Sequence, residues 1–139
     1  MKNEILIRKA ILSDLPACLK LMQHDNLRDA AGEYPTEEYV TAFIGGAGFI
    51  VAMNNDKIVG LVMGEKINMG GFLLHYLISD PEYQVGKKIL DYLFNYLIIN
   101  KYKFILGYAN ANDTGLLNLY ERKYGCAVGR PLCEILKEL

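Results

Sequence analysis

The residues with the most distinctive chemistry lie where an apolar stretch, residues 72–79, runs through a short loop into a long helical pattern. That pattern opens with Gln84, Val85, Gly86, Lys87 and Lys88. The first turn of a helix presents unpaired backbone N–H groups and the positive end of the helix dipole, and both attract phosphates. Lysines in that turn are unfavourable for an isolated helix, and a polyphosphate in front of them would explain their position. Taken alone, the junction is explained at least as well by two solvated surface lysines.

Three side chains are candidate general bases. Glu65 lies near the end of one predicted strand, His75 within the next strand, and Glu82 in the loop after it. A general base removes a proton from a nucleophile so that the nucleophile has a lone pair with which to attack. His75 alternates with Leu73 and Leu77, so a core histidine is the simpler interpretation, and both glutamates are more often solvated than catalytic. Deprotonation through water, without a dedicated base, stays open.

Hydrophobic periodicity predicts the elements that must position these residues. Strands are predicted at 4–9, 48–53, 57–67, 72–79, 102–108 and 132–136, with a short strand-like segment at 126–128. Helices are predicted at 13–22 (capped by Ser13), 36–43, 85–100 and 115–124. The buried face of helix 85–100 would carry Val85, Ile89, Leu90, Leu93, Phe94, Leu97 and Ile98. The order βααβββαβαββ is a mixed α/β (α+β) fold in which strand 72–79, apolar on both faces, is central.

Composition narrows the class of protein. A chain of 139 residues that is 52% hydrophobic and 22% charged is expected to form one globular domain, residues 1–139. A formal net charge of -1 argues against nucleic-acid binding. The three cysteines, Cys18, Cys126 and Cys133, match no metal or disulfide motif, so no metal site and a cytoplasmic location are expected. Because no apolar run reaches the roughly 18 residues of a membrane span, no membrane association is expected.

Two ordered motifs resemble those of the GNAT superfamily of N-acetyltransferases. The first is Pro81-Glu82-Tyr83-Gln84 followed by Gly86-Lys87-Lys88-Ile89-Leu90, which is similar to the family's acetyl-CoA loop. The second runs from Asn112 through Leu119-Tyr120-Glu121-Arg122 to Tyr124-Gly125, with Cys126 where an aromatic residue is usual. The predicted element order is also the family's order. Two motifs in matching elements are more specific than either alone, and the resemblance covers the whole chain.

The acetyl-CoA loop departs from the family pattern in one respect. After Gln84 the motif has a glycine at the third position and glycine or alanine at the fifth, where this chain has Lys87 and Ile89. Aligning the helix instead makes the loop about three residues shorter. A shorter loop offers fewer N–H groups to the phosphates, so weaker, different or lost cofactor binding is an expected consequence.

The resemblance implies a role for each matching position. The backbone of Leu77 and Ser79 would face the pantetheine arm of acetyl-CoA. Gln84, Val85, Gly86, Lys87 and Lys88 would face the pyrophosphate. Asn112 would contact the cofactor near the thioester, with Asp113 as an alternative occupant and a helix cap as the alternative role.

Tyr120 would be the general acid by the same resemblance. When an amine attacks a thioester it expels a thiolate, and a phenol of pKa about 10 can protonate a thiolate whose conjugate acid has a pKa of about 8.5. Packing is the alternative, because the chain has 10 tyrosines. The neighbouring Leu119, Glu121 and Arg122 favour the functional interpretation.

The resulting hypothesis is an N-acetyltransferase that moves acetyl from acetyl-CoA to an unidentified primary amine by direct attack. The alternative is a non-catalytic GNAT-fold module that binds a partner or a CoA-like ligand through a degenerate site, and a nucleotide-binding domain is a weaker third. A homodimer is possible, since the last strand could pair across an interface.

Overall fold

The structure is a computed structural model that describes residues 4–24, 27, 32–46, 48–107 and 114–127. Its centre is a mixed five-stranded sheet in the order β1-β2-β3-β4-β5. The strands are β1 (Ile5–Lys9), β2 (Phe49–Asn54), β3 (Lys57–Ile67), β4 (Gly71–Ser79) and β5 (Phe104–Gly107). Neighbouring strands are antiparallel except for β4 and β5, which are parallel. The predicted mixed sheet and the inner position of β4 are therefore confirmed.

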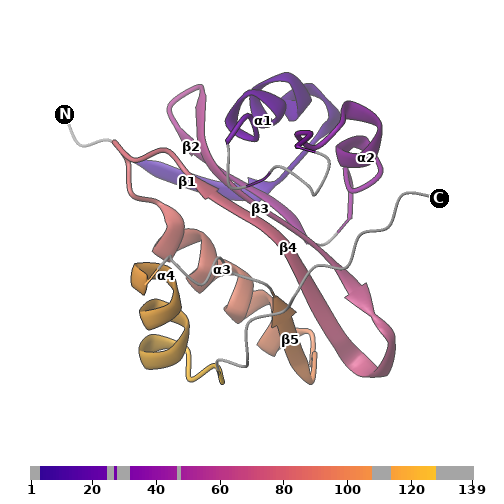
Figure 1. Ribbon diagram of the computed structural model, residues 1–139, viewed down its shortest axis with the longest axis vertical. Helices are drawn as coiled ribbons and strands as arrows, with labels where there is room; N and C mark the ends of the chain where they lie inside the picture. The colour runs from indigo at the N-terminus through magenta and orange to yellow at the C-terminus, as the bar shows by residue number, and fades with distance from the viewer. Residues whose placement is uncertain (1–3, 25–26, 28–31, 47, 108–113, 128–139) are drawn as a thin grey trace.

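Helices cover both faces of this sheet (Figure 1). On one face lie α1 (Leu15–Leu21) and α2 (Glu37–Thr41), and on the other lie α3 (Gly86–Ile99) and α4 (Thr114–Asn118). Successive residues of a strand point to opposite faces, so β2 sends Val51 to the first core cluster and Ile50 to the second. The first core cluster packs under α1 and α2, and the second packs under α3. Among the described helices, none is long and apolar enough to span a bilayer.

The predicted element order is confirmed as far as α4. The predicted strand 132–136 lies outside the described residues, and Cys126, at the start of the predicted segment 126–128, is not in a strand. Ser13 as a helix cap is wrong: it lies in a 3-10 turn, η1 (Leu12–Asp14), which precedes α1. The carboxylate of Asp14 instead accepts hydrogen bonds from the N–H of Ile11 at 2.8 Å and from the Arg8 guanidinium at 2.7 and 2.9 Å.

One prediction about α3 is also wrong, at its C-terminal end. Ile98 was expected on the buried face but is 71% exposed. The helix buries Ile89, Leu90, Leu93 and Leu97, a stripe with the spacing of one helix face. Ile98 falls outside that stripe, and α3 ends one residue later.

A bulge in β4 changes which side chains face which helices. Met63 of β3 pairs with Tyr76, whereas the next residue, Gly64, pairs with Leu74, so His75 is an extra residue in β4. Leu74 and Leu77 both pack in the second core cluster, while Tyr76 packs against the first. His75 contacts the Phe43 ring beside α2, with ring centroids 5.3 Å apart. Because of the bulge, two consecutive residues, His75 and Tyr76, lie on the α2 side of the sheet.

Candidate active site

The edge of β4 that faces β5 is paired along only the first half of the strand. Its parallel pairing with β5 runs from Gly71 with Phe104 to Leu74 with Gly107 and ends there. From the bulge to Ser79, β4 has no paired strand on that side among the described residues, and its side chains are half-buried. This half of β4 contains Leu77 and Ser79, the two residues whose backbone was expected to face pantetheine. An extended ligand with amide groups can lie along such an edge as an added strand does.

The loop after β4 is a tight turn built around Asp80. The Asp80 carboxylate accepts a hydrogen bond from the N–H of Glu82 at 3.0 Å. The Asp80 carbonyl accepts hydrogen bonds from the N–H groups of Tyr83 at 3.0 Å and Gln84 at 3.2 Å. Gln84 turns the chain with a left-handed backbone (φ 47°). The short loop therefore uses its own amides for the turn, and the amides that remain for a ligand are those of the helix that follows.

Ser79 and Val85 close the turn against the core. The Val85 N–H donates a hydrogen bond to Ser79 Oγ at 2.9 Å. The Val85 side chain is buried in the second core cluster, so close to Gly60 that a Cβ on that glycine would lie 2.5 Å from Val85 Cγ2. Of the residues expected at the pyrophosphate, Val85 thus has its side chain in the core and its amide bonded to Ser79.

The first turn of α3 has the features of an anion site. The first bond within the helix runs from the Ile89 N–H to the Val85 carbonyl at 3.0 Å, so no helical carbonyl precedes Gly86, Lys87 and Lys88 to accept from their amides. No side chain caps the helix, and its first turn contains no acidic residue. The side chains of Gln84, Lys87 and Lys88 are exposed at this end.

Gly86 has space beside it in the part of the chain that the structure describes. There a Cβ built on Gly86 would meet one atom within 4 Å, the Ser79 Cβ at 3.8 Å, which is an ordinary contact. Gly86 is not among the glycines with positive φ. Neither the backbone nor the packing of the described chain therefore requires glycine here, although alanine is the better helix former. A ligand that approaches the backbone closely would require it.

Tyr120 lies on the same side of the sheet as this helix end. It belongs to a π-helical turn, η4 (Leu119–Lys123), that continues α4, and its carbonyl accepts a hydrogen bond from the Cys126 N–H at 2.9 Å. Its half-buried side chain packs against the second core cluster, which also contains Val85 and Ile89. Short π-helical segments recur at functional sites. The other residues expected near the thioester, Asn112 and Asp113, lie outside the described residues.

A polar network attaches η4 to α3. The Tyr124 hydroxyl donates a hydrogen bond to Asp91 Oδ1 at 2.7 Å, and Lys123 Nζ lies 2.9 Å from the same oxygen. The Tyr124 ring stacks on Phe94 with centroids 4.4 Å apart. The hydrogen bonds from Lys123 and Tyr124 lower the pKa of Asp91, while burial and the bond to Asp91 raise the pKa of Tyr124. The sequence motif included Tyr124 but did not indicate its partner, because Asp91 has the sequence pattern of a solvated residue of α3.

Two of the three proposed bases form a pair on the α2 side of β4. His75 Nε2 lies 3.0 Å from Glu65 Oε2, and the histidine side chain is 23% exposed. The rings of Phe43, Tyr39 and Tyr76 surround His75, with centroids at 5.3, 6.3 and 6.3 Å. His75 is therefore a half-buried histidine paired with a carboxylate, and such a pair can accept a proton. Glu82 is exposed in the Asp80 turn, beside the anion site, and is not part of this pair.

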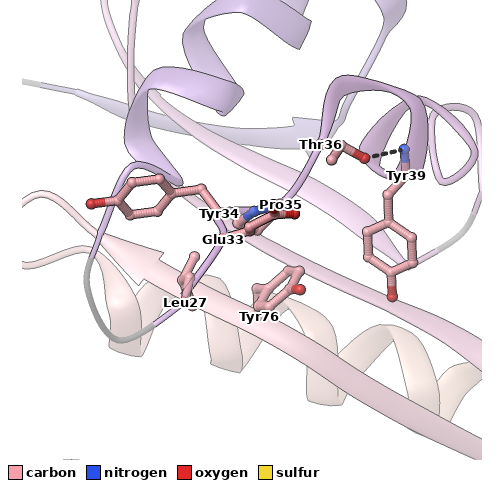
Figure 2. A pocket seen from close by; sticks show the side chains of 7 residues that line it. All are labelled: Leu27, Glu33, Tyr34, Pro35, Thr36, Tyr39 and Tyr76. Atoms are coloured by element: carbon pink, nitrogen blue, oxygen red, sulfur yellow. Dashed lines mark hydrogen bonds between the residues drawn. The ribbon is translucent and has the colours of Figure 1, made fainter. Parts of the chain in front are cut away.

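A pocket of about 260 Å³ lies on the same side of β4 (Figure 2). It lies where residues 33–36 cross over β4, and its walls are Leu27, Glu33, Tyr34, Pro35, Thr36, Tyr39 and Tyr76. Tyr39 and Tyr76 line the pocket and their rings also contact His75, which is not itself among the lining residues. Sequence analysis did not identify this pocket, because the bulge that brings Tyr76 to this face leaves no clear pattern in the sequence.

Comparisons with known proteins bear on the fold. No protein-family model matches the sequence, and no curated protein matches it. Solved structures of N-acetyltransferases do match. The ribosomal-protein-S18-alanine N-acetyltransferase of Escherichia coli superposes with a TM-score of 0.71 at 20% identity, covering 85% of this chain and 75% of that one. An aminoglycoside acetyltransferase from an uncultured soil metagenomic sample gives a TM-score of 0.71 at 19% identity, covering 99% of this chain and 98% of that one.

A third similar structure is that of the PaiA N-acetyltransferase from Thermoplasma acidophilum in complex with coenzyme A. It gives a TM-score of 0.66 at 19% identity and covers 86% of this chain and 88% of that one. Another match is a GNAT-family acetyltransferase of Streptococcus pneumoniae. The chain therefore has the GNAT N-acetyltransferase fold, which confirms the fold expected from the two sequence motifs.

Proposed function

We propose that this chain is a single-domain N-acetyltransferase that transfers acetyl from acetyl-CoA to a primary amine. The observation that carries the proposal is the junction of β4 and α3. There the pairing of β4 with β5 ends at Leu74, and β4 leads into a helix whose first turn carries two lysines. Among the described residues, the first amides of this helix have no backbone partner and Gly86 has no close neighbour on its open side. The similar enzyme from Thermoplasma acidophilum is described in complex with coenzyme A, which supports this choice of ligand.

The chain's own groups suit the two parts of that co-substrate. The amides of Gly86, Lys87 and Lys88, with the lysine side chains and Gln84, would hold the diphosphate. The free edge of β4 at Leu77 and Ser79 would hold the pantetheine amides. Val85 would act through its position, because its side chain anchors the turn in the core. When bound, acetyl-CoA supplies the activated acetyl group and a thiolate leaving group.

Direct attack by the amine is favoured over an acyl-enzyme on cysteine. Burial raises the pKa of Cys18 to about 12, and it also raises the pKa of Cys126. A thiol with a raised pKa contains little thiolate at neutral pH and is a poor nucleophile. Of the cysteines that the structure describes, neither therefore suits a covalent step.

Two proton transfers complete the proposed reaction. His75 accepts a proton from the attacking amine. Its Nε2–H would donate to Glu65, which leaves Nδ1 with the lone pair that takes this proton. Tyr120 donates the proton of its hydroxyl to the departing thiolate, because a phenol is acidic enough for that transfer.

A binding experiment and a turnover experiment together test the proposal. Calorimetric titration with acetyl-CoA should show saturable binding, and thiol release should increase when a panel of primary amines is added. The absence of heat at high micromolar protein would contradict the proposal. The acceptors named for the similar structures, a ribosomal-protein alanine and aminoglycosides, are reasonable members of the panel because each offers an amine.

One observation favours a second candidate, a non-catalytic module that binds CoA or a partner. The Asp80 turn uses the amides of Glu82, Tyr83 and Gln84 internally, so the phosphate site depends on the helix alone. CoA binding without thiol release in the presence of any amine would select this candidate. A homodimer and a cytoplasmic location stay predictions.

A further inference from the structure

We infer that a hollow at the start of β2 binds a neutral, planar aromatic ligand with an adjacent hydrogen-bond donor and acceptor, such as an aryl carboxamide or a nucleobase. The hollow has a volume of about 420 Å³. It lies between the turn that follows α2 and the part of β3 that extends beyond β2. This site is separate from the proposed acetyl-CoA site, and the inference goes beyond the proposed reaction.

One side of the hollow is a strand edge. The pairing of β3 with β2 ends at Met63, whereas β3 pairs with β4 as far as Ile67. The Gly64 N–H donates to the Gly48 carbonyl at 2.9 Å, and the alternation of a strand turns the N–H and carbonyl of Lys66 to that same side. Among the described residues, no strand pairs with Lys66 there. The backbone of Lys66, a lining residue, therefore offers the hollow one donor and one acceptor.

Aromatic rings line the hollow on both faces of the sheet. Phe43 lies on the α2 side, where it packs against the first core cluster. Phe72 and Tyr102 lie on the α3 side, with ring centroids 6.0 Å apart in an edge-to-face contact. Gly48 and Gly64 allow this arrangement, because a Cβ on either would lie 2.6 Å from a Phe72 ring atom. A flat ring beside β3 would therefore have aromatic neighbours toward both faces.

The strand edge and the rings together define the chemistry of the ligand. A primary or cyclic amide has its N–H and carbonyl side by side, and it can exchange two hydrogen bonds with Lys66 as a residue of a paired strand does. These bonds would hold the amide in the plane of the sheet. An aromatic ring conjugated with the amide shares that plane, so its faces would turn toward Phe43 and toward Tyr102. A saturated ring would fill the volume without these aromatic contacts.

The charges at the hollow favour a neutral ligand. Glu65 and Lys66 both line it, and they have opposite signs. Consecutive residues of a strand direct their side chains to opposite faces, so a charged ligand would be attracted at one face and repelled at the other. The Glu65 carboxylate is also paired with His75 at 3.0 Å. Aryl carboxamides and uncharged nucleobases meet this requirement.

The experiment titrates the isotope-labelled protein with benzamide and follows the backbone amide resonances by NMR. Saturable shifts are expected at Lys66 and Gly64, with a Kd of about 1 mM or lower. N,N-dimethylbenzamide lacks the N–H donor and cyclohexanecarboxamide lacks the aromatic ring, so each should bind at least about threefold more weakly. Uracil and nicotinamide distinguish a nucleobase from an aryl carboxamide by which of them binds more tightly. Saturating acetyl-CoA should leave the Kd for benzamide unchanged.

Two variants test the strand edge directly. Lys66→Pro removes the N–H where it has no strand partner, a position at which a strand tolerates proline, and should weaken benzamide binding at least about threefold. Lys66→Ala keeps the N–H and removes the charge, so it is the matched control and should bind benzamide as the parent does. Thermal unfolding verifies that both variants fold, and the comparison of benzamide with its dimethyl analogue tests the same hydrogen bonds on the parent protein. Equal affinity for those two amides, no saturable shift at Lys66 below about 10 mM benzamide, or displacement by acetyl-CoA would each overturn the inference.

Discussion

The Tyr124 hydroxyl donates a 2.7 Å hydrogen bond to Asp91 Oδ1, and this bond joins the turn that carries Tyr120 to the helix that carries Gly86. Stacking of Tyr124 on Phe94 and the Lys123–Asp91 ion pair reinforce the same joint. The proposed proton donor and the proposed phosphate site are therefore held to each other by a contact between helices rather than by the sheet.

Tyr124→Phe should keep the ring stacking and lose the hydrogen bond. We expect the free energy of unfolding to fall by about 1 kcal/mol near neutral pH, because the partners are partly exposed to solvent. The raised pKa of Tyr124 means that its contribution is complete below about pH 10 and is lost as the pH rises further. The lowered pKa of Asp91 means that its contribution is complete above about pH 4 and is lost in acid. Urea unfolding of both proteins across pH measures this, and a difference that does not vary with pH would contradict it.

Gly86→Ala should separate stability from ligand binding. Folding should be unaffected or slightly more stable, because a Cβ there meets only ordinary contact and alanine favours the helix. Affinity for acetyl-CoA should fall by about tenfold, because the methyl group would occupy space next to the diphosphate. Gly60→Ala provides the contrast: its Cβ would lie 2.5 Å from Val85 Cγ2, so it should lower the melting temperature. Full acetyl-CoA affinity in Gly86→Ala would place the ligand elsewhere.

Tyr120→Phe should retain acetyl-CoA binding and lose turnover. General acid catalysis of this kind contributes on the order of 10²-fold or more to the rate, so kcat should fall by at least about that factor. Tyr92→Phe, a substitution at an exposed tyrosine of α3, is the matched control and should leave kcat unchanged. Calorimetry for binding and thiol release for kcat give both quantities. Unchanged turnover in Tyr120→Phe would limit Tyr120 to packing.

His75→Gln should remove the base while keeping a polar partner for Glu65. We expect kcat to fall at neutral pH, where most acceptor amine is protonated. Turnover should recover as the pH approaches about 10, near the pKa of an alkylamine, because free amine then no longer needs a base. Glu65→Gln should give a smaller loss in the same direction. A pH profile of kcat for each variant tests this, and a loss that stays constant with pH would indicate a structural role.

Asp14→Asn should lower the free energy of unfolding, because it removes the negative charge that pairs with Arg8. The Asp14 side chain is 7% exposed and accepts hydrogen bonds from both Arg8 guanidinium nitrogens and from the Ile11 N–H. The hydrogen bond from Arg8 lowers the pKa of Asp14, so its stabilisation is present above about pH 4 and is lost below it. The free energy of unfolding of the variant should be about 2 kcal/mol lower near neutral pH, and it should fall less in acid than that of the parent protein. Asp56→Asn, in the exposed turn between β2 and β3, is the control and should behave like the parent.

Much of the fold was predictable because the pattern of this chain is regular. The range of β3 agrees in full with the prediction, since its apolar run is bounded by an Asn-Asn-Asp turn on one side and the glycines at Gly70-Gly71 on the other. Asn55 adopts the left-handed backbone expected for that turn, with φ 53°. Thr36 caps α2 as expected, accepting from the Tyr39 N–H at 3.2 Å. These features depend on local residue types, which a single sequence contains.

The candidate site was less predictable because its parts depend on contacts across the sheet. Period-two alternation places His75 with Leu77, and only the pairing of Met63 and Gly64 shows that an extra residue separates their faces. The pair of His75 with Glu65 follows from that register, since the two residues are distant in sequence. Val85 was expected at the phosphates from its place in the motif, whereas the core beneath Gly60 takes its side chain.

The bulge at His75 has a consequence for how this protein can vary. The alternation of side chains between the two faces of the sheet shifts by one residue at the bulge. The number of amino acids in β4 therefore matters more than their individual identity. Conservative exchanges along the strand preserve both halves. Deleting one residue at the bulge would instead turn every later side chain of β4, up to Ser79, to the opposite face of the sheet. Side chains that now face α2 would then face α3, and the reverse, although the hydrophobicity of the strand would not change.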